Sequence, residues 1–392
     1  MPATGRNYII AGAGISGMTL ALALAKFGAS VLVLERSPGV QEFGAGLQIS
    51  PNARLVLNQL GLSDAIDQVS LEPTALDVYP QGSLAPAVSM ELGTLMRERF
   101  GSPYAVMHRA DLAGLLYKAC RRFANIDILF GVRGWTVDAQ DRGVTVSVEE
   151  ASGQTRTTRG LAFLGADGVH SQTRQTLLDG PAARFGRRLA WRTLVPAGDV
   201  ADYLAIDPVS VFFGSGFHVV CYPMPHRGQV NLALFMPGDT PDKPSGQPRP
   251  ARPGKRAGAI IAAAGNRWTP WPLFTVDTPT WHKGNIGLLG DAAHAMVPFQ
   301  AQGAAMGIED AAVLARLLAN GAAEDANSAL ASYVTERQAR VRRVAALSAS
   351  NGRIFHMKWP LSMARNLVMT SQGPRGHLKR LGWIYDYDAG LV

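Results

Sequence analysis

Apolar and polar positions at the start of the chain predict a strand, a turn and a helix in succession. The apolar stretch Asn7–Ala11 predicts a buried β-strand, and apolar residues at helical spacing then extend to about Phe27. A second apolar run, Val31–Glu35, predicts another strand. This order indicates a βαβ unit, and such units build parallel sheets with right-handed crossovers.

The same two patterns recur further along the chain. Pro51–Leu60 and Ala110–Arg122 predict helices, because their apolar residues have helical spacing after an Asn or Asp near the start. Val144–Glu149 and Ala162–Gly165 predict strands. The first part of the chain therefore alternates strands and helices, as α/β proteins do.

Between about Arg184 and Phe274 the pattern changes to short β-branched or aromatic segments separated by Gly or Pro. This pattern predicts an inserted antiparallel sheet, in which Pro237–Gly258 forms an exposed loop. A strand at Ile286–Leu289 returns the chain to the first domain, and helices fill most of the remainder. The candidate strands of the inserted sheet are Val209–Phe213, His218–Tyr222 and Val230–Phe235.

The expected architecture is α/β with two domains, for which 392 residues are sufficient. We predict a Rossmann-like nucleotide-binding domain formed by residues 1–70, 101–183 and 277–322. We predict a substrate-binding β-sheet domain formed by residues 71–100 and 184–276, followed by a helical C-terminal region over residues 323–392.

The net charge of +8 is concentrated near the C-terminus, where residues 331–392 contain ten Lys or Arg and three Asp or Glu. A solvated helical surface explains this charge, and attraction to an acidic partner or to an anionic membrane surface is the alternative. No nucleic-acid-binding motif accompanies the charge, so we expect no nucleic acid partner. We expect a monomer or a homodimer.

Cysteine and histidine usage exclude other classes of site. Cys120 and Cys221 are the only cysteines, which argues against a disulfide framework. The eight histidines show no metal-ligand spacing, so no metal is expected. The apolar stretch Tyr8–Ala25 is interrupted by glycines, which fits a buried strand–turn–helix better than a membrane span, and we expect a cytoplasmic protein.

The turn after the first strand carries the motif Gly12-x-Gly14-x-x-Gly17, with Ile15 and Ser16 at its centre. Gly12 permits a tight turn, Gly14 permits close backbone approach to a pyrophosphate, and Gly17 permits close helix–strand packing. The helix N-terminus faces the phosphates. In this strand–turn–helix setting, the motif predicts a dinucleotide site.

Glu35, which is followed by Arg36, ends the second strand. A carboxylate at this place accepts hydrogen bonds from a ribose diol and repels a 2′-phosphate. This feature favours FAD or NAD at the site, but it does not distinguish between them.

Four further motifs follow in order. Two of them are glycine–aspartate segments far downstream of the N-terminal turn. The four read Gly44-Ala-Gly46-Leu47-Gln48-Ile-Ser-Pro51-Asn52, His108-Arg109-Ala-Asp111-Leu, Gly165-Ala-Asp167-Gly168-Val-His-Ser171 with Arg174, and Gly290-Asp291-Ala-Ala-His294 continuing through Pro298-Phe299-Gln-Ala-Gln302-Gly303-Ala304.

With the N-terminal motif, these segments resemble the class A flavoprotein monooxygenases, in the branch of salicylate, hydroxybenzoate and hydroxynicotinate hydroxylases. The resemblance runs from residue 7 to about residue 320. It implies a GR2-type Rossmann-like fold, bound FAD, transient NADH or NADPH, and O2. It also implies hydroxylation of a small aromatic substrate through a flavin C4a-hydroperoxide. Many members of the family have a glycine at the position of Ala301.

The resemblance and the physical roles of the residues together give an expected cofactor site. Asp291 is expected to hold ribityl hydroxyls, and the helix that begins near Gln302 is expected to direct its N-terminus at the flavin. Glu309 and Asp310 are expected to cap or stabilise helix packing. The expected cofactor-binding residues are Gly12, Gly14, Ile15, Ser16, Gly17, Glu35, Arg36, Gly46, Leu47, Gln48, Arg109, Asp167, Gly168, Arg174, Gly290, Asp291, Pro298, Gln302, Gly303 and Ala304.

The catalytic candidates are His218 as base or relay and Tyr222 as a hydrogen-bond partner of the substrate. Residues four apart on a strand share a face, so both side chains are expected to project towards the flavin. A hydrogen-bonded pair inside a sheet is the alternative. Arg188 or Arg192 is a candidate for a substrate carboxylate. The expected substrate pocket contains Gln48, Arg192, Pro298, Phe299 and Gln302.

The leading hypothesis is an FAD-dependent monooxygenase that hydroxylates a small phenolic or aromatic carboxylic acid. The same flavin chemistry on a pyridine ring or on a lipophilic phenol is an alternative. Two hypotheses from other classes are an NAD-dependent dehydrogenase, which leaves the later motifs unexplained, and a non-catalytic flavin-binding protein.

Overall fold

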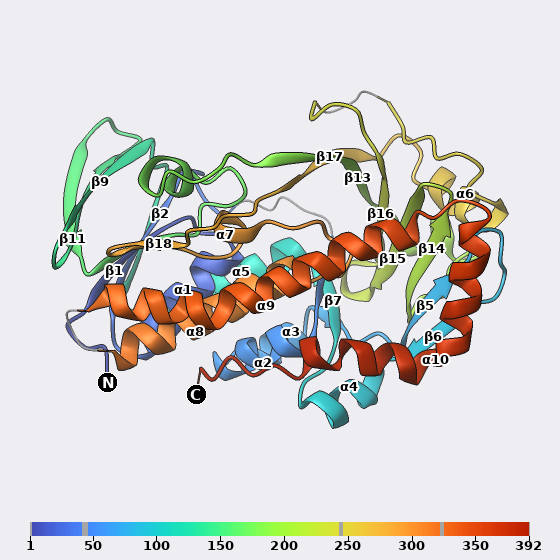
Figure 1. Cartoon of the computed structure of the whole chain (residues 1–392), viewed down its shortest axis with the longest axis horizontal. Helices are drawn as coiled ribbons and strands as arrows, with labels where there is room; N and C mark the ends of the chain where they lie inside the picture. The colour runs from blue at the N-terminus through green and yellow to red at the C-terminus, as the bar shows by residue number, and fades with distance from the viewer. Residues whose placement is uncertain (1, 41–45, 243–245, 322–324, 392) are drawn as a thin grey trace.

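The computed structural model of the chain describes residues 2–40, 46–242, 246–321 and 325–391. Gly44 of the second motif lies outside these residues, as does the predicted boundary between residues 322 and 323. Two large β-sheets form the two ends of an elongated molecule, and the long helix α9 (Ala326–Phe355) runs from one end to the other (Figure 1).

The first sheet has six strands in the order β18-β19-β12-β1-β2-β8. All neighbours in it are parallel except the edge strand β18. The helices α1 (Ile15–Lys26), α5 (Arg109–Cys120) and α8 (Gly303–Asn320) pack together beside it. Its strands are β1 (Asn7–Ala11), β2 (Ser30–Glu35), β8 (Ile126–Phe130), β12 (Ala162–Gly165), β18 (His282–Lys283) and β19 (Ile286–Leu288).

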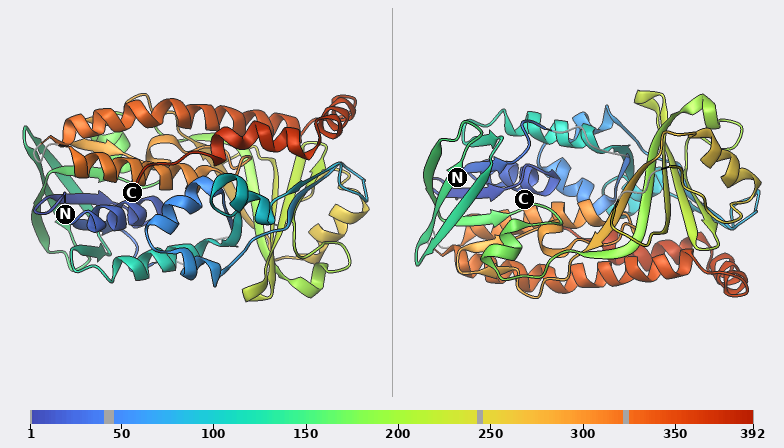
Figure 2. Two further views of the ribbon diagram at one scale, coloured as in Figure 1. Left: turned by 90° about the horizontal axis from the view of Figure 1, so that it is seen from below. Right: turned by 90° about the horizontal axis from the view of Figure 1, so that it is seen from above.

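The second sheet has seven strands in the order β17-β13-β16-β15-β14-β5-β6. It is antiparallel except where β14 pairs with β5. Its position at the far end of the molecule is clear in both views of Figure 2. Its strands are β5 (Ala75–Tyr79), β6 (Val88–Glu91), β13 (Arg184–Pro196), β14 (Val209–Gly214), β15 (Phe217–Met224), β16 (Gln229–Pro237) and β17 (Thr269–Thr275).

The predicted loop Pro237–Gly258 ends earlier than expected. Helix α6 (Lys255–Ala263) begins within it, because Ala257 and Ile260 are buried against one face of the second sheet. The opposite face of that sheet carries Phe235, which packs with Phe299 from the first domain. The second sheet is therefore covered on both faces.

Two small sheets and several helices complete the fold. The small sheets are formed by β9 (Gly134–Gln140), β10 (Gly143–Glu149) and β11 (Thr155–Gly160), and by β3 (Gly46–Ile49), β4 (Ser70–Leu71) and β7 (Ala105–His108). The remaining helices are α2 (Pro51–Gln59), α3 (Ser63–Asp67), α4 (Gly93–Phe100), α7 (Asp291–His294) and α10 (Leu361–Tyr385), the last with a break at Gly373.

The predicted α/β class, the Rossmann-like parallel sheet and the helical C-terminal region are confirmed. We propose domain bounds at residues 1–70, 101–183 and 277–322 for the first domain, and at 71–100 and 184–276 for the second. These bounds assign each of the two large sheets to one domain.

A buried ion-pair network joins α9 to α8. Arg337, which is fully buried, pairs with Glu309 at 2.6 Å and with Asp310 at 2.8 Å. Asp310 also accepts hydrogen bonds from Gly290 N at 3.1 Å and from His294 Nε2 at 2.5 Å. Burial raises the pKa of Asp310, but His294 and Arg337 outweigh it and lower the pKa to about 2. The network therefore ties the α7 turn to the helix core.

Candidate cofactor and substrate site

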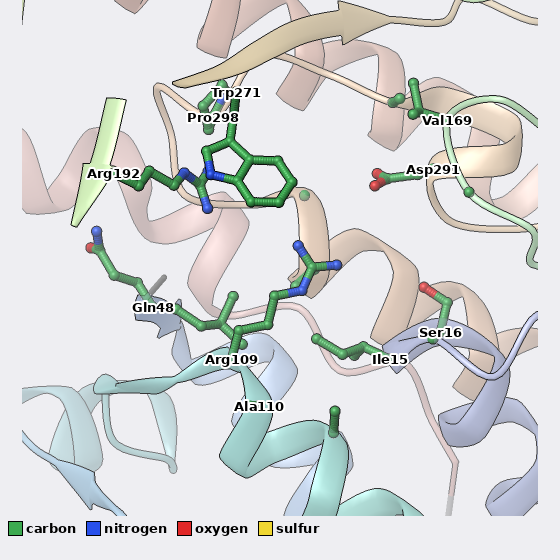
Figure 3. Close-up of a pocket in the computed structure, with 18 of the residues that line it drawn as sticks. Ile15, Ser16, Gln48, Arg109, Ala110, Val169, Arg192, Trp271, Asp291 and Pro298 are labelled. Carbon is green, nitrogen blue, oxygen red and sulfur yellow. The ribbon is translucent and has the colours of Figure 1, made fainter. Parts of the chain in front are cut away.

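A cavity of about 640 Å³ lies between the two large sheets. It is lined by the segments that follow β1, β12 and β19 of the first sheet, and by β13, β15, β16 and β17 of the second. The carboxyl edge of a parallel sheet is the usual ligand site in such folds. We name this space the first cavity; Figure 3 shows part of its lining.

The three motif glycines occupy their positions for different structural reasons. A Cβ atom on Gly12, whose φ is +104°, would lie 2.4 Å from the Ala166 carbonyl oxygen, and one on Gly17 would lie 2.0 Å from the Gly12 carbonyl oxygen. A Cβ atom on Gly14 would meet no atom within 4 Å, and Gly14 lines the first cavity. The chain itself therefore requires Gly12 and Gly17, whereas Gly14 leaves space for a ligand.

Two helix N-termini converge on the first cavity. Gly14, Ile15 and Ser16 at the start of α1 line it, as do Gly303 and Ala304 at the start of α8. Neither helix has an acidic residue in its first turn, so the partial positive charge at the two N-termini is not compensated locally. The cavity is therefore electrostatically suited to an anionic ligand group such as a pyrophosphate.

Two carboxylates line the same cavity. Glu35 Oε2 accepts a hydrogen bond from Ala13 N, and its Oε1 accepts one from Ser37 N, both at 2.8 Å. Each oxygen retains a lone pair for a further donor such as a ribose hydroxyl. Asp291 is exposed at the start of α7, which follows β19 of the same sheet, and it faces the cavity (Figure 3).

Two arginines project into the first cavity from opposite sides. Arg192 extends from β13 beside Trp271, and Arg109 extends from the start of α5 (Figure 3). Arg192 Nε is buried and has no hydrogen-bond partner among the described residues. The pKa of Arg192 is lowered, mainly because the group is buried. Tyr222 acts to raise this pKa, and Arg109 lowers it further. A half-buried guanidinium group whose buried Nε has no partner among the described residues, with a second cation nearby, predicts an anionic ligand.

Tyr222 lies against Gly46 and forms part of the same wall. A Cβ atom on Gly46 would lie 2.3 Å from Tyr222 Oη, so only glycine fits there. Gly46 N donates a hydrogen bond of 2.7 Å to Asn231 Oδ1, which fixes β3 against the second sheet. Burial raises the pKa of Tyr222, so its hydroxyl remains protonated and can donate a hydrogen bond.

These residues fit FAD as the ligand of the first cavity. The two helix N-termini and Gly14 suit the pyrophosphate, Glu35 suits a ribose, and Asp291 suits ribityl hydroxyls. Gly303 and Ala304 leave space for close backbone approach at the other end.

A second cavity of about 1070 Å³ lies between the second sheet and the helices α9 and α10. Its lining is mostly apolar and includes His218, Phe299 and Phe355. Gln48, Val220, Pro298 and Ala301 line both cavities, so the two spaces adjoin there. Ala301 has a φ of +53°, a conformation that favours glycine.

The structure brings most of the expected site residues to the first cavity. The members of the three expected sets that line it are Gly14, Ile15, Ser16, Glu35, Gly46, Leu47, Gln48, Arg109, Gly168, Arg192, Tyr222, Asp291, Pro298, Gly303 and Ala304. His218 and Phe299 line the second cavity instead. The strand spacing predicted that His218 and Tyr222 project into one space. In the structure they line adjoining cavities, and Val220 between them lines both.

Several expected residues lie off the lining of both cavities. Gly12 and Gly290 lie in the turns behind the first cavity, Gly17 lies in the first turn of α1, and Arg36 is exposed. Asp167 accepts hydrogen bonds from Ser171 and Thr173, and Gln302 donates one to Ser50.

Arg174 is also directed away from the first cavity. It is fully buried and donates to the carbonyl oxygens of Pro181, Ala292 and Val169. In this structure Arg174 fixes the loops around the site, and it does not line the space that fits the cofactor.

Trp271 and His356 were not expected at the site. Trp271 lines the first cavity from β17, and His356 contacts His218 from the end of α9. Neither residue belongs to a motif, so only the tertiary structure identifies them. Residue 356 is 138 positions after His218 in the chain.

Several known proteins are similar to this chain in sequence and in fold. Residues 7–348 match the sequence model of a family described as FAD binding domain. The chain is 34% identical to 3-hydroxybenzoate 6-hydroxylase 1 of Aquipseudomonas alcaligenes, with 97% of each chain covered. It is 32% identical to a 3-amino-4-hydroxybenzoate 2-monooxygenase of Streptomyces platensis, with 98% of this chain and 96% of that one covered. A substrate complex of salicylate hydroxylase matches with a TM-score of 0.79 and 25% identity, covering 100% of this chain and 97% of that one.

The chain therefore belongs to this family of FAD-binding proteins. It is an FAD-dependent monooxygenase, which uses NAD(P)H and O2 as co-substrates. Among the residues that the structure describes, no helix is both long and apolar enough to span a membrane.

Proposed function

We propose that the protein hydroxylates a small phenolic carboxylic acid of the hydroxybenzoate type. The observation that carries this proposal is Arg192, which lines the first cavity and whose buried Nε has no hydrogen-bond partner within the described part of the chain. Figure 3 shows Arg192, Gln48 and Pro298 at the same end of the first cavity. The names of the relatives, hydroxylases of hydroxybenzoates and aminohydroxybenzoates, support the same substrate class.

In this proposal, the residues of the chain bind and orient the aromatic ring. Arg192 pairs with the carboxylate, and Tyr222 and Gln48 donate hydrogen bonds near it. Pro298 and Phe299 contact the ring faces, and His218 contacts the phenol oxygen from the second cavity. Bound FAD supplies the redox chemistry, in which NAD(P)H provides the electrons and O2 provides the oxygen atom. The apolar walls of the second cavity keep water away from the ring.

A panel of phenolic and pyridine carboxylic acids tests this proposal. The FAD-loaded protein should oxidise NADH or NADPH faster in the presence of a hydroxybenzoate and release a product with one more oxygen atom. Faster oxidation that yields only hydrogen peroxide would mean that the acid is an effector and not a substrate. A response to uncharged, lipophilic phenols alone would favour a second candidate function, the hydroxylation of a lipophilic phenol. The volume and the apolar lining of the second cavity support this candidate.

Replacing Arg192 with methionine should weaken substrate binding while FAD stays bound. A hydrogen-bonded pair between charged groups contributes roughly 1.5–3 kcal/mol, so the KM for the acid should rise about 10- to 100-fold. The matched control is Arg184→Met, which removes an exposed cation from the same strand. An unchanged KM in Arg192→Met would remove Arg192 from substrate recognition.

We also propose that the start of α10 is the part of the protein that contacts anionic membrane surfaces. We propose that the protein otherwise works in the cytoplasm. More than half of the surface of five apolar side chains is exposed at the start of α10, and Lys358, Arg375, Lys379 and Arg380 are exposed nearby. Sedimentation with phosphatidylserine vesicles should carry the protein down at low salt. Dimerisation in solution without vesicle binding would assign the surface to a second copy instead. The five are Trp359, Leu361, Met363, Leu367 and Val368.

A further inference from the structure

Three side chains from separate elements form a polar chain beside the second cavity. His218 lies on β15, Arg188 lies on β13, and His356 directly follows α9. His218 Nδ1 and His356 Nε2 are 2.7 Å apart. His356 Nδ1 contacts an Nη atom of Arg188. Hydrogen bonds therefore connect the Arg188 guanidinium group to the His218 ring.

The direction of these hydrogen bonds follows from the chemistry of arginine, which can only donate. His356 Nδ1 must therefore accept from Arg188, and the single proton of neutral His356 must lie on Nε2. That N–H donates to His218 Nδ1. The single proton of neutral His218 consequently lies on Nε2.

Burial and neighbouring cations hold both imidazoles neutral. Burial, Arg188 and Arg365 lower the pKa of His356 to about 3. Burial, His356 and Arg188 lower the pKa of His218 well below its usual value. Among the described residues, the charged and titratable groups that shift these two pKa values are Arg188, Arg365 and His356, and none of them is a carboxylate.

The surroundings of His218 leave Nε2 for a ligand. Its ring stacks on Phe235 with a centroid distance of 4.6 Å, and it makes edge-to-face contacts with Phe299 and Phe355 at centroid distances of 5.2 and 5.3 Å. These aromatic rings restrict the imidazole to one orientation. His218 lines the second cavity, and its Nε2 has no hydrogen-bond partner among the described residues.

We propose that Arg188 and His356 are positioning residues that fix His218 as a hydrogen-bond donor to the phenolate oxygen of the substrate. The inference rests on the proposed function for the identity of the ligand. His218 Nε2 already carries a proton, so His218 does not take the phenol proton. That proton passes to solvent, and the site binds the ionised phenol. The sequence-based expectation of a base at His218 thus becomes a donor role.

The tautomer of His218 is measurable without substrate. Nitrogen-15 NMR of the FAD-loaded protein with labelled histidine distinguishes a protonated ring nitrogen from an unprotonated one. We expect His218, assigned with a His218→Asn variant, to carry its proton on Nε2. Arg188→Met should release the preference and give a mixture of tautomers, whereas Arg188→Lys retains a donor and should preserve it. A proton on Nδ1 of His218 in the unmodified protein would overturn the inference.

A second readout follows the ligand and separates this inference from the proposed function. The ultraviolet difference spectrum of bound 3-hydroxybenzoate, titrated with pH, reports the pKa of its phenol. This pKa should rise by about one unit in Arg188→Met and should not change in Arg187→Met, which removes a neighbouring exposed cation. Equal pKa values in both variants would contradict the positioning role. If 3-hydroxybenzoate does not bind at all, the proposed substrate class fails, while the NMR result still decides the tautomer.

Discussion

Replacing Gly14 with valine should abolish FAD binding and leave the fold intact. A Cβ atom at this position would meet no protein atom within 4 Å, so we expect the fold to tolerate the substitution. The valine side chain would occupy the part of the first cavity that two helix N-termini make suitable for the pyrophosphate. We expect the Kd for FAD to rise by about a hundredfold or more, which corresponds to roughly 3 kcal/mol.

Two other glycine variants make this result specific. Gly134→Val adds the same bulk at the start of β9, where a Cβ atom also meets nothing, and should bind FAD normally. Gly17→Val should fail to fold, because its Cβ atom would lie 2.0 Å from the Gly12 carbonyl oxygen. Flavin fluorescence titration and circular dichroism measure the two properties. A Gly14→Val protein that purifies yellow would show that the pyrophosphate lies elsewhere.

Replacing Arg337 with methionine should destabilise the protein by about 3–5 kcal/mol. Methionine fills a similar space, but it leaves Glu309 and Asp310 fully buried with only part of their compensating charge. Removing one partner of a buried ion pair costs more than the pair contributes, because the remaining charge stays desolvated. Urea denaturation monitored by tryptophan fluorescence gives the change in the free energy of unfolding.

The matched control is Arg342→Met on the same helix, where the arginine is exposed and the expected change is within about 0.5 kcal/mol. The loss in Arg337→Met should also depend on pH. The pKa of Asp310 is lowered to about 2 in the folded state, so its contribution is complete above its unfolded pKa of about 4. It disappears as the pH falls through about 2. A loss that is the same at all pH values would contradict the role of this carboxylate.

The cofactor side of the protein could be predicted from the sequence because its signals are local. A strand, a glycine turn and a helix follow one another within residues 7–26, and each glycine has a steric or ligand-related reason in the structure. Asp291 and Gly303 are likewise placed by the ends of adjacent elements. Such signals need no knowledge of how distant segments pack.

The substrate side could be predicted only in part because it is assembled from distant segments. The strand spacing placed His218 and Tyr222 on one face, but it could not show that two cavities adjoin at Val220 between them. His356 has no pattern around it, and it reaches His218 only because α9 spans the molecule. Arg174 belongs to a motif, yet its burial and its carbonyl partners direct it away from the first cavity.

The most direct test of the proposed hydroxylation uses oxygen gas labelled with a heavy isotope. The FAD-loaded protein is supplied with NADH or NADPH and the hydroxybenzoate that most stimulates its oxidation, and the product is examined by mass spectrometry. We expect one labelled oxygen atom in the aromatic product for each NAD(P)H consumed. A product with oxygen from water, or label found only in hydrogen peroxide, would contradict the assignment of this protein as an aromatic hydroxylase.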